Sequence, residues 1–139
     1  MRTTRWGIAL ATALVLFCGW IISAQTLATR HVMEVKLAHS QRILESLMMS
    51  DFETLQRESE ALSQMTSEAG WAVLGTPEYS RYSGAFKDAL TDLRDAATRR
   101  DLDASMLHYT NVTMTCYRCH RYVKNARIAH GSREQEGKP

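Results

Sequence analysis

Two cysteines and a histidine near the carboxyl end of the chain have the types and the spacing to hold an iron cofactor. They are Cys116, Cys119 and His120, in the order Cys-Tyr-Arg-Cys-His. Two thiols three positions apart can add across the vinyl groups of a porphyrin as thioethers, and the histidine that follows can supply an axial nitrogen to the iron. The motif therefore predicts covalently attached haem c.

Zinc binding and thiol redox chemistry are the alternatives for this motif. Zinc takes about four ligands, usually as two separated pairs. Because the chain after its leader has no second cysteine pair, His108 or His130 would have to complete such a set. A thioredoxin-like pair lies where a strand passes into a helix, whereas the residues around Cys116 have helical character. Both alternatives fit the residues less well than haem.

The first 24 residues have the features of a signal peptide or of a membrane anchor. Arg2 and Arg5 precede an apolar run, and no charged side chain occurs from residue 6 to residue 29. Ala24 ends a passable cleavage site, but the run is also close to the roughly 20 residues that span a bilayer. Either outcome predicts that the rest of the chain lies on the periplasmic side of the cytoplasmic membrane.

The exported part has little net charge and few thiols. Without Arg2 and Arg5, 15 basic residues remain against 15 acidic ones. This balance disfavours a general nucleic-acid-binding role. Cys18 lies in the apolar run, so Cys116 and Cys119 are the thiols of the exported part. A fold held together by several disulfides is therefore excluded.

Apolar residues recur with helical spacing in four segments after the leader. In the first segment, about residues 26–50, the apolar positions are Leu27, Met33, Leu37, Leu44, Leu47 and Met48. Ser50 and Glu53 have the form of a capping box and predict the start of a second helix. Its apolar positions are Phe52, Leu55, Leu62 and Met65.

Thr76 followed by Pro77 predicts the start of a third helix. Its apolar positions are Tyr79, Tyr82, Phe86, Leu90, Leu93 and Ala97, with Arg99 and Arg100 in its last turn. Asp101 or Asp103 opens a fourth helix, which we expect to end near Gly131. One stripe of this helix carries the cysteine and histidine motif, and its positions are Leu102, Met106, Tyr109, Val112 or Thr113, Cys116, His120 and Val123.

These helices predict an all-α fold, because no segment after the leader alternates apolar and polar residues as a strand would. Four helices with short connections favour an antiparallel four-helix bundle. The expected organisation is a signal peptide or signal anchor over residues 1–24, a helical domain over residues 25–131 and a polar tail over residues 132–139.

The motif in the last of four helices resembles the class II c-type cytochromes, the cytochrome c-prime family. The carrying residues are Cys116, Cys119 and His120, together with Lys124, which stands where the family has a basic residue four positions after its ligand histidine. Low-spin members of the family place a methionine near the start of the first helix, and Met33 matches it. The resemblance implies a haem c domain in which Met33 is the second axial ligand.

The resemblance extends over about residues 30–127. The chain departs from the family at Thr29, where the family has an arginine, and at Val123, where an aromatic residue is frequent. The segment over residues 71–82 also differs from the usual connection, and the family gives it no role.

Geometry supports Met33 independently. In an antiparallel bundle the first and fourth helices are neighbours, so Met33 and His120 should lie at similar heights. At about 100° per residue, Leu37 falls roughly 40° from Met33 around the helix axis, whereas His31 and His39 fall roughly 160° and 120° away. We therefore expect His31 and His39 to be exposed and to point away from the iron.

These expectations favour an electron-transfer protein whose haem c is held by His120 and Met33. The alternative leaves the sixth position vacant and gives a five-coordinate haem that binds nitric oxide or carbon monoxide. An enzyme such as a peroxidase is disfavoured, because the expected distal stripe of Met33, Leu37 and Leu44 lacks an acid-base group.

The expected partners are redox proteins. The sequence does not decide between a monomer and a homodimer. Four basic residues, Arg118, Arg121, Lys124 and Arg127, recur every three positions around the motif, so they cannot all share one helix face. We interpret the outward ones as a rim that steers an acidic partner, with pairing to haem propionates or to neighbouring carboxylates as the alternative.

Overall fold

Four helices make up the part of the chain that the structure, a computed structural model, describes, which is residues 27–68 and 70–136. The first helix covers residues 27–49. It is followed by α2 (Phe52–Gln64), the short 3-10 helix η1 (Met65–Ser67), α3 (Pro77–Thr98) and α4 (Leu102–Glu136). No strand occurs in these ranges. The prediction of an all-α fold is thus confirmed for the described residues.

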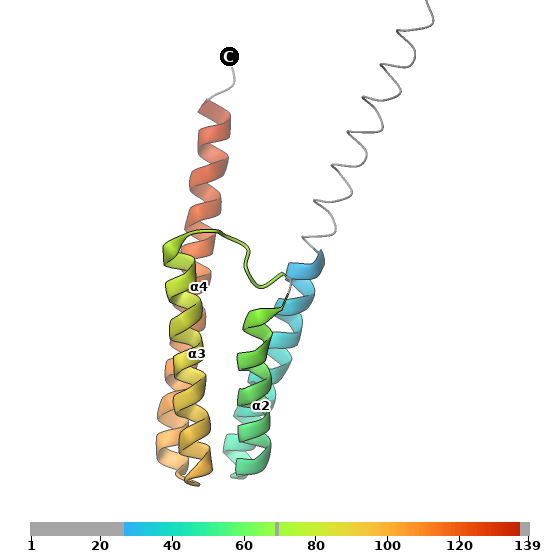
Figure 1. The fold of residues 1–139 in the computed structure, drawn as a ribbon, viewed down its shortest axis with the longest axis vertical. Helices are drawn as coiled ribbons and strands as arrows, with labels where there is room; N and C mark the ends of the chain where they lie inside the picture. Colours follow the sequence, from blue (N-terminus) through green and yellow to red (C-terminus); the bar gives the residue numbers. More distant parts are fainter. Residues whose placement is uncertain (1–26, 69, 137–139) are drawn as a thin grey trace, which may run out of the picture.

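The helices lie side by side, and consecutive helices run in opposite directions (Figure 1). The first helix and α2 form one hairpin, α3 and α4 form the other, and residues 70–76 cross between the hairpins at the end opposite the two tight turns. This is the antiparallel arrangement expected from the short connections. The predicted leader, with Cys18, lies outside the described residues.

The starts of the later helices follow from their capping residues. The Thr76 hydroxyl accepts from the Tyr79 amide at 3.2 Å, and Pro77 occupies the first turn of α3. An Asp101 carboxylate oxygen accepts from the Ala104 amide at 3.0 Å at the start of α4. These two starts agree with the sequence, because both side chains satisfy amides that have no partner within the helix.

The cap of α2 differs from the prediction. Asp51 rather than Ser50 accepts from the Thr54 amide, at 3.0 Å. Ser50 has a φ of 54° and its amide donates to the Leu47 carbonyl at 3.2 Å. Ser50 therefore ends the first helix in the left-handed conformation, which leaves the next residue to begin α2.

Two expected helix ends also differ. Arg99 and Arg100 follow α3 instead of lying in its last turn, and Arg100 has a φ of 56°. Helix α4 continues past Gly131 to Glu136 and projects beyond the other labelled helices (Figure 1). Glycine permits the backbone to leave the helix but does not require it to do so.

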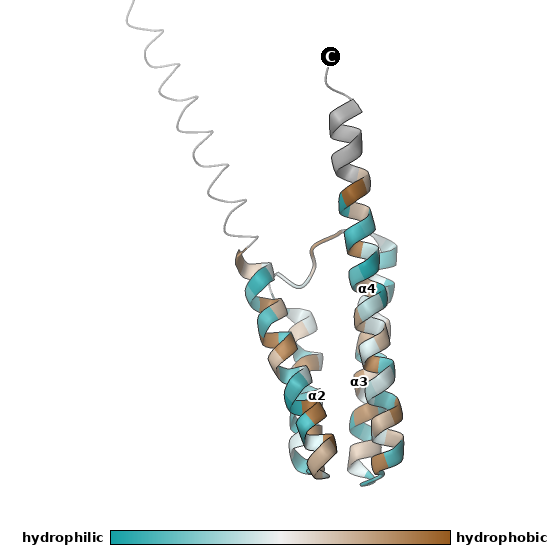
Figure 2. Ribbon diagram, turned by 180° about the vertical axis from the view of Figure 1, so that it is seen from behind, coloured by the Kyte–Doolittle hydropathy of each residue, from teal (hydrophilic) through white to brown (hydrophobic). Residues whose placement is uncertain are grey.

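The buried side chains form one apolar core along the bundle, as the helical patterns of α2 and α3 predict. Hydrophilic and hydrophobic residues are mixed along each helix, so each can bury one side (Figure 2). The core residues are Val32, Ile43, Leu47, Leu55, Leu62, Met65, Trp71, Tyr79, Phe86, Ala89, Leu90, Leu93, Ala97 and Val112.

The expected inward face of the first helix is wrong in part. Leu37 is 59% exposed and Leu44 is 42% exposed, whereas Val32, Ile43 and Leu47 are buried. Apolar residues occur around more than one side of this helix, so their spacing alone does not identify the side that faces the core. The stripe of α4 is also only partly inward: Val112 is buried, and Leu102 and Met106 are partly exposed.

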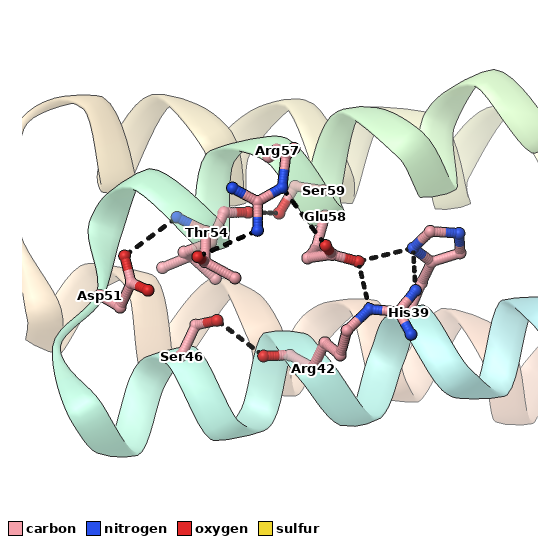
Figure 3. Close-up of polar contacts among 9 residues, drawn as sticks. His39, Arg42, Ser46, Asp51, Thr54, Arg57, Glu58 and Ser59 are labelled. Atoms are coloured by element: carbon pink, nitrogen blue, oxygen red, sulfur yellow. Dashed lines mark hydrogen bonds and ion pairs between the residues drawn. The ribbon is translucent and has the colours of Figure 1, made fainter.

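A buried carboxylate joins the first helix to α2 (Figure 3). Glu58 is buried and accepts from the Arg42 Nε at 2.7 Å, and it lies 2.7 Å from the His39 Nδ1. Burial favours a raised pKa for Glu58, but the hydrogen bonds from Arg42 and His39 outweigh it and hold the pKa below its ordinary value. His39 is thus half-buried and paired, rather than exposed as expected.

Within the described residues, no helix combines the length and the apolar character that crossing a bilayer requires.

Candidate functional site

A cavity of about 450 Å³ opens among the first helix, α3, α4 and the connection before α3. Its size is within the range of roughly 300–1,000 Å³ that is usual for ligand sites. The residues that line it are Thr29, Met33, Lys36, Trp71, Val73, Tyr79, Cys119, His120, Val123, Lys124, Arg127 and Ile128. Three of the four predicted site residues, Met33, Cys119 and His120, therefore meet at one cavity.

The two thiols lie on the inner side of α4. Cys116 and Cys119 are free, half-buried and packed against the core. Cys116 is four positions before His120, a spacing that places two residues on the same side of a helix. Burial raises the pKa of both thiols, and the positive charge of Lys36 opposes that rise. The thiols are therefore protonated at neutral pH and close enough together to hold one cofactor.

His120 lies at the edge of the cavity and is exposed. Burial of part of its ring lowers its pKa, and the charge of Lys36 lowers it further. The neutral imidazole that results carries a nitrogen lone pair. This is the form that an axial ligand of iron requires.

Met33 faces the same cavity from the first helix. This agrees with the expectation that the early first helix and the late α4 lie at similar heights. Leu37 and Leu44 do not line the cavity and are largely exposed. The expected apolar distal stripe is therefore wrong beyond Met33, because the first helix turns a different side inward.

Lys36 is a charged cavity residue that the sequence patterns did not indicate. It is 8% exposed, and its Nζ lies 4.2 Å from the ring centroid of Phe86 and 4.6 Å from that of Trp71. Burial lowers its pKa. Its spacing from Val32 and Ile43 could have revealed its position, because these three residues recur at helical intervals on one side. A charged residue on a core stripe is unusual and marks a site of interest.

Lys36 brings a titratable group to the wall that was expected to have none, so the composition of this wall no longer disfavours an enzyme. That the protein is no enzyme stays a prediction.

The connection before α3 forms a wall of the cavity. The Trp71 indole N–H donates to the Ser83 hydroxyl at 3.1 Å, and the Tyr79 hydroxyl donates to the Trp71 carbonyl. Gly70 has a φ of +92°, and a Cβ there would lie 3.1 Å from the Ala28 carbonyl carbon. These contacts fix the indole beside the cavity, a role for this segment that neither pattern nor resemblance indicated.

The four basic residues of α4 divide into two pairs. Lys124 and Arg127 line the cavity, whereas Arg118 and Arg121 are exposed and lie away from it. The Arg121 guanidinium lies 5.4 Å from the ring centroid of Tyr117. As expected from their spacing, the four do not share one face.

The donor set of the site fits a haem. Two thiols and an imidazole lie on α4, a thioether comes from the first helix, and aromatic, aliphatic and basic side chains complete the lining. Among the described side chains there is no group of three histidine, cysteine or acidic residues that could hold a metal ion. The side chain of His130, a zinc-ligand candidate, lies outside them.

Comparison with known proteins returned no match to this chain, whether against family models, curated proteins or solved structures.

Proposed function

We propose that this protein is an exported c-type cytochrome that transfers electrons through one covalently bound haem, with His120 and Met33 as the axial ligands. The observation that carries this proposal is that Met33 and His120 line one cavity from two different helices, beside a free pair of thiols. The resemblance to the cytochrome c-prime family points to the same function.

Each residue has a defined task in this function. Cys116 and Cys119 attach the porphyrin through thioether bonds, so the cofactor cannot dissociate. His120 would supply a neutral imidazole nitrogen to the iron, and Met33 would supply a thioether sulfur. Such a pair of ligands favours the reduced state and raises the potential. The bound haem supplies an iron that changes between the ferric and ferrous states.

The surroundings of the site are compatible with electron exchange. Trp71 and Tyr79 close one side of the cavity, and their hydrogen bonds to Ser83 and to the Trp71 carbonyl hold them in place. Because both axial positions are filled by the protein, no substrate has to bind. We further propose that the site lies on the periplasmic side of the cytoplasmic membrane, with residues 1–24 either cleaved or kept as an anchor. An acidic redox protein would dock on the basic rim, which the outward Arg118 and Arg121 form.

Haem attachment tests the proposal directly. The full chain, with its leader, is produced in a bacterium that matures c-type cytochromes, and the purified protein is extracted with acidified organic solvent. We expect the haem to stay with the protein. The variant with Cys116→Ser and Cys119→Ser should release any haem that it holds, because both thioether bonds are absent.

Cys18→Ser is the matched control, because Cys18 lies in the predicted leader and should not affect attachment. A wild-type chain that carries zinc and no haem would contradict the proposal.

The absorption spectrum tests the axial ligands. A low-spin spectrum is expected for the wild type, and Met33→Ala should shift the ferrous spectrum toward high spin and open the ferrous iron to carbon monoxide. Leu37→Ala is the control, since Leu37 points away from the cavity. A wild-type spectrum that is already high-spin in both oxidation states would move the function to the binding of nitric oxide or carbon monoxide.

A further inference from the structure

Lys36 is a buried cation without an acidic partner. Its side chain is more than nine-tenths buried, and no carboxylate forms an ion pair with it within the described residues. The faces of Trp71 and Phe86, at 4.6 and 4.2 Å, are its close polarisable neighbours. Burying a charge is costly unless it is paired or bound. We therefore expect the Lys36 amine to interact with the group that binds in the cavity.

The position of Lys36 places it on the wall opposite the motif of α4. Lys36 and Met33 come from the same helix and line the same cavity. Lys36 is three positions after Met33, which corresponds to about 60° around the helix axis and about 4.5 Å along it. The charge of Lys36 acts on Cys116, Cys119 and His120. Two donor groups of different chemistry thus come from one helix to the cavity that His120 also lines.

The two donors prefer different oxidation states of iron. A thioether is a soft ligand that favours ferrous iron, while an amine nitrogen is harder and favours the ferric state. An amine can bind iron only through its lone pair, so it must first lose its proton. Burial in an apolar wall, without a carboxylate to hold that proton, favours the neutral form.

We propose that the Lys36 amine is a second axial ligand of this site, which takes the place of the Met33 thioether when the iron is ferric. The inference rests on the proposed function and extends it to an exchange of ligands between two residues of the first helix. On oxidation by the partner protein, the Lys36 ammonium releases one proton to solvent at the cavity mouth and its nitrogen forms the bond that the Met33 sulfur gives up. On reduction, the sulfur rebinds and the amine takes up a proton.

Spectra of the haem-loaded wild type in both oxidation states test the exchange without any substitution. Sulfur ligation gives ferric haem a weak charge-transfer band at long wavelength that nitrogen ligation does not give. We expect a low-spin ferric protein that lacks this band and a ferrous protein with methionine ligation. A ferric wild type that shows the sulfur band would overturn the exchange while leaving the proposed electron-transfer function intact.

Substitutions at Lys36 identify the nitrogen. Lys36→Gln and Lys36→Arg should both lose the wild-type ferric spectrum and keep the ferrous one. The arginine variant separates ligation from charge, because its guanidinium stays protonated and has no lone pair to give. If Lys36 acted only through its charge, Lys36→Arg would keep the wild-type ferric spectrum, which would contradict the proposal.

Two further variants complete the set. Met33→Leu should change the ferrous spectrum and leave the ferric one as in the wild type, the reverse of the Lys36 variants. Lys87→Gln, at an exposed position of α3, is the control for removing a lysine and should change neither spectrum. A chain that carries no haem in any of these forms would overturn the proposed function together with the exchange.

Discussion

The two ends of the helical bundle differ in the groups that fill the space between the helices. At the turn end, where the first helix meets α2 and α3 meets α4, the large fully buried side chains are aliphatic, and the small hydroxyl side chain of Ser105 is buried with them. The aliphatic ones are Ile43, Leu47, Leu55, Leu93 and Val112. At the cavity end the helices enclose Lys36, Trp71 and the two thiols. The end that is simplest to pack is thus separate from the end that carries the reactive groups.

This separation shows how a small bundle can hold unfavourable groups. Aliphatic packing needs only matched shapes, so the turn end can stabilise the fold with no cofactor. A buried amine and two buried thiols contribute less to stability than apolar side chains of their size would, because polar groups lose hydration on burial. The turn end compensates for that loss, which frees the cavity end for chemistry.

Substitution of Leu93 by alanine should have the largest effect on stability. Leu93 is 0% exposed, and removing a fully buried leucine side chain costs about 2–5 kcal/mol. Met33→Ala, at a half-buried position beside the cavity, should cost less. Chemical denaturation of both purified variants measures the free energy of unfolding. Equal losses at the two positions would show that the two ends do not differ in this way.

The Glu58 cluster lies between the two ends and should make stability depend on pH. Because the pKa of Glu58 is lower in the folded protein than in the unfolded chain, its contribution is complete above the ordinary value of 4.5 and disappears as the pH falls through the folded value. Glu58→Gln should cost about 1.5–3 kcal/mol at neutral pH.

The loss should shrink in acid, because the wild-type carboxyl is then protonated too. Denaturation of the wild type, Glu58→Gln and the exposed control Glu53→Gln between pH 3 and pH 7 measures this dependence. A constant difference between wild type and Glu58→Gln over that range would contradict it.

Tyr79→Phe should loosen the cavity wall with a smaller loss of stability. The change removes the hydroxyl that donates to the Trp71 carbonyl, and one lost hydrogen bond in a buried place costs about 1–3 kcal/mol. Tyr117→Phe, at an exposed position of α4, is the control. Amide hydrogen exchange should become faster over residues 71–76 and stay unchanged at the turn end. Faster exchange throughout the bundle would mean that the two ends are not independent.

The basic rim should affect association and leave stability almost unchanged. Arg118→Glu with Arg121→Glu should slow electron exchange with an anionic partner at low salt, because both residues are exposed and outside the cavity and the steering attraction is reversed. The visible spectrum and the free energy of unfolding should change little. Stopped-flow kinetics at several ionic strengths measures the effect. A rate that depends on neither salt nor these substitutions would show that docking occurs elsewhere.

Much of the fold could be predicted from local chemistry. The starts of α3 and α4 follow from Thr76 with Pro77 and from Asp101, because a side chain that satisfies free amides acts over only a few residues. The inward side of α3 follows from a single clear stripe. The first helix could not be predicted so well, because Leu37 and Leu44 compete with Val32 and Ile43 for the inward position.

Only part of the candidate site could be predicted from local sequence patterns. Cys116, Cys119 and His120 form a motif within five consecutive residues, and the antiparallel arrangement brought Met33 opposite them. Lys36 was missed because a lysine is usually solvated. The path of residues 70–76 was also beyond prediction, because it depends on tertiary contacts such as the close approach of Gly70 to Ala28.

The two walls of the cavity come from opposite ends of the chain, and this separation sets the order in which the site can form. The motif with Cys119 and His120 is complete within five neighbouring residues, so under the proposed function the thiols could capture a porphyrin while the chain is still unfolded. Met33 and Lys36 reach that wall only after three connections have formed, and contacts between distant residues form late in folding. A freshly exported chain would therefore carry its cofactor with one axial ligand first, and closing of the bundle would supply the other.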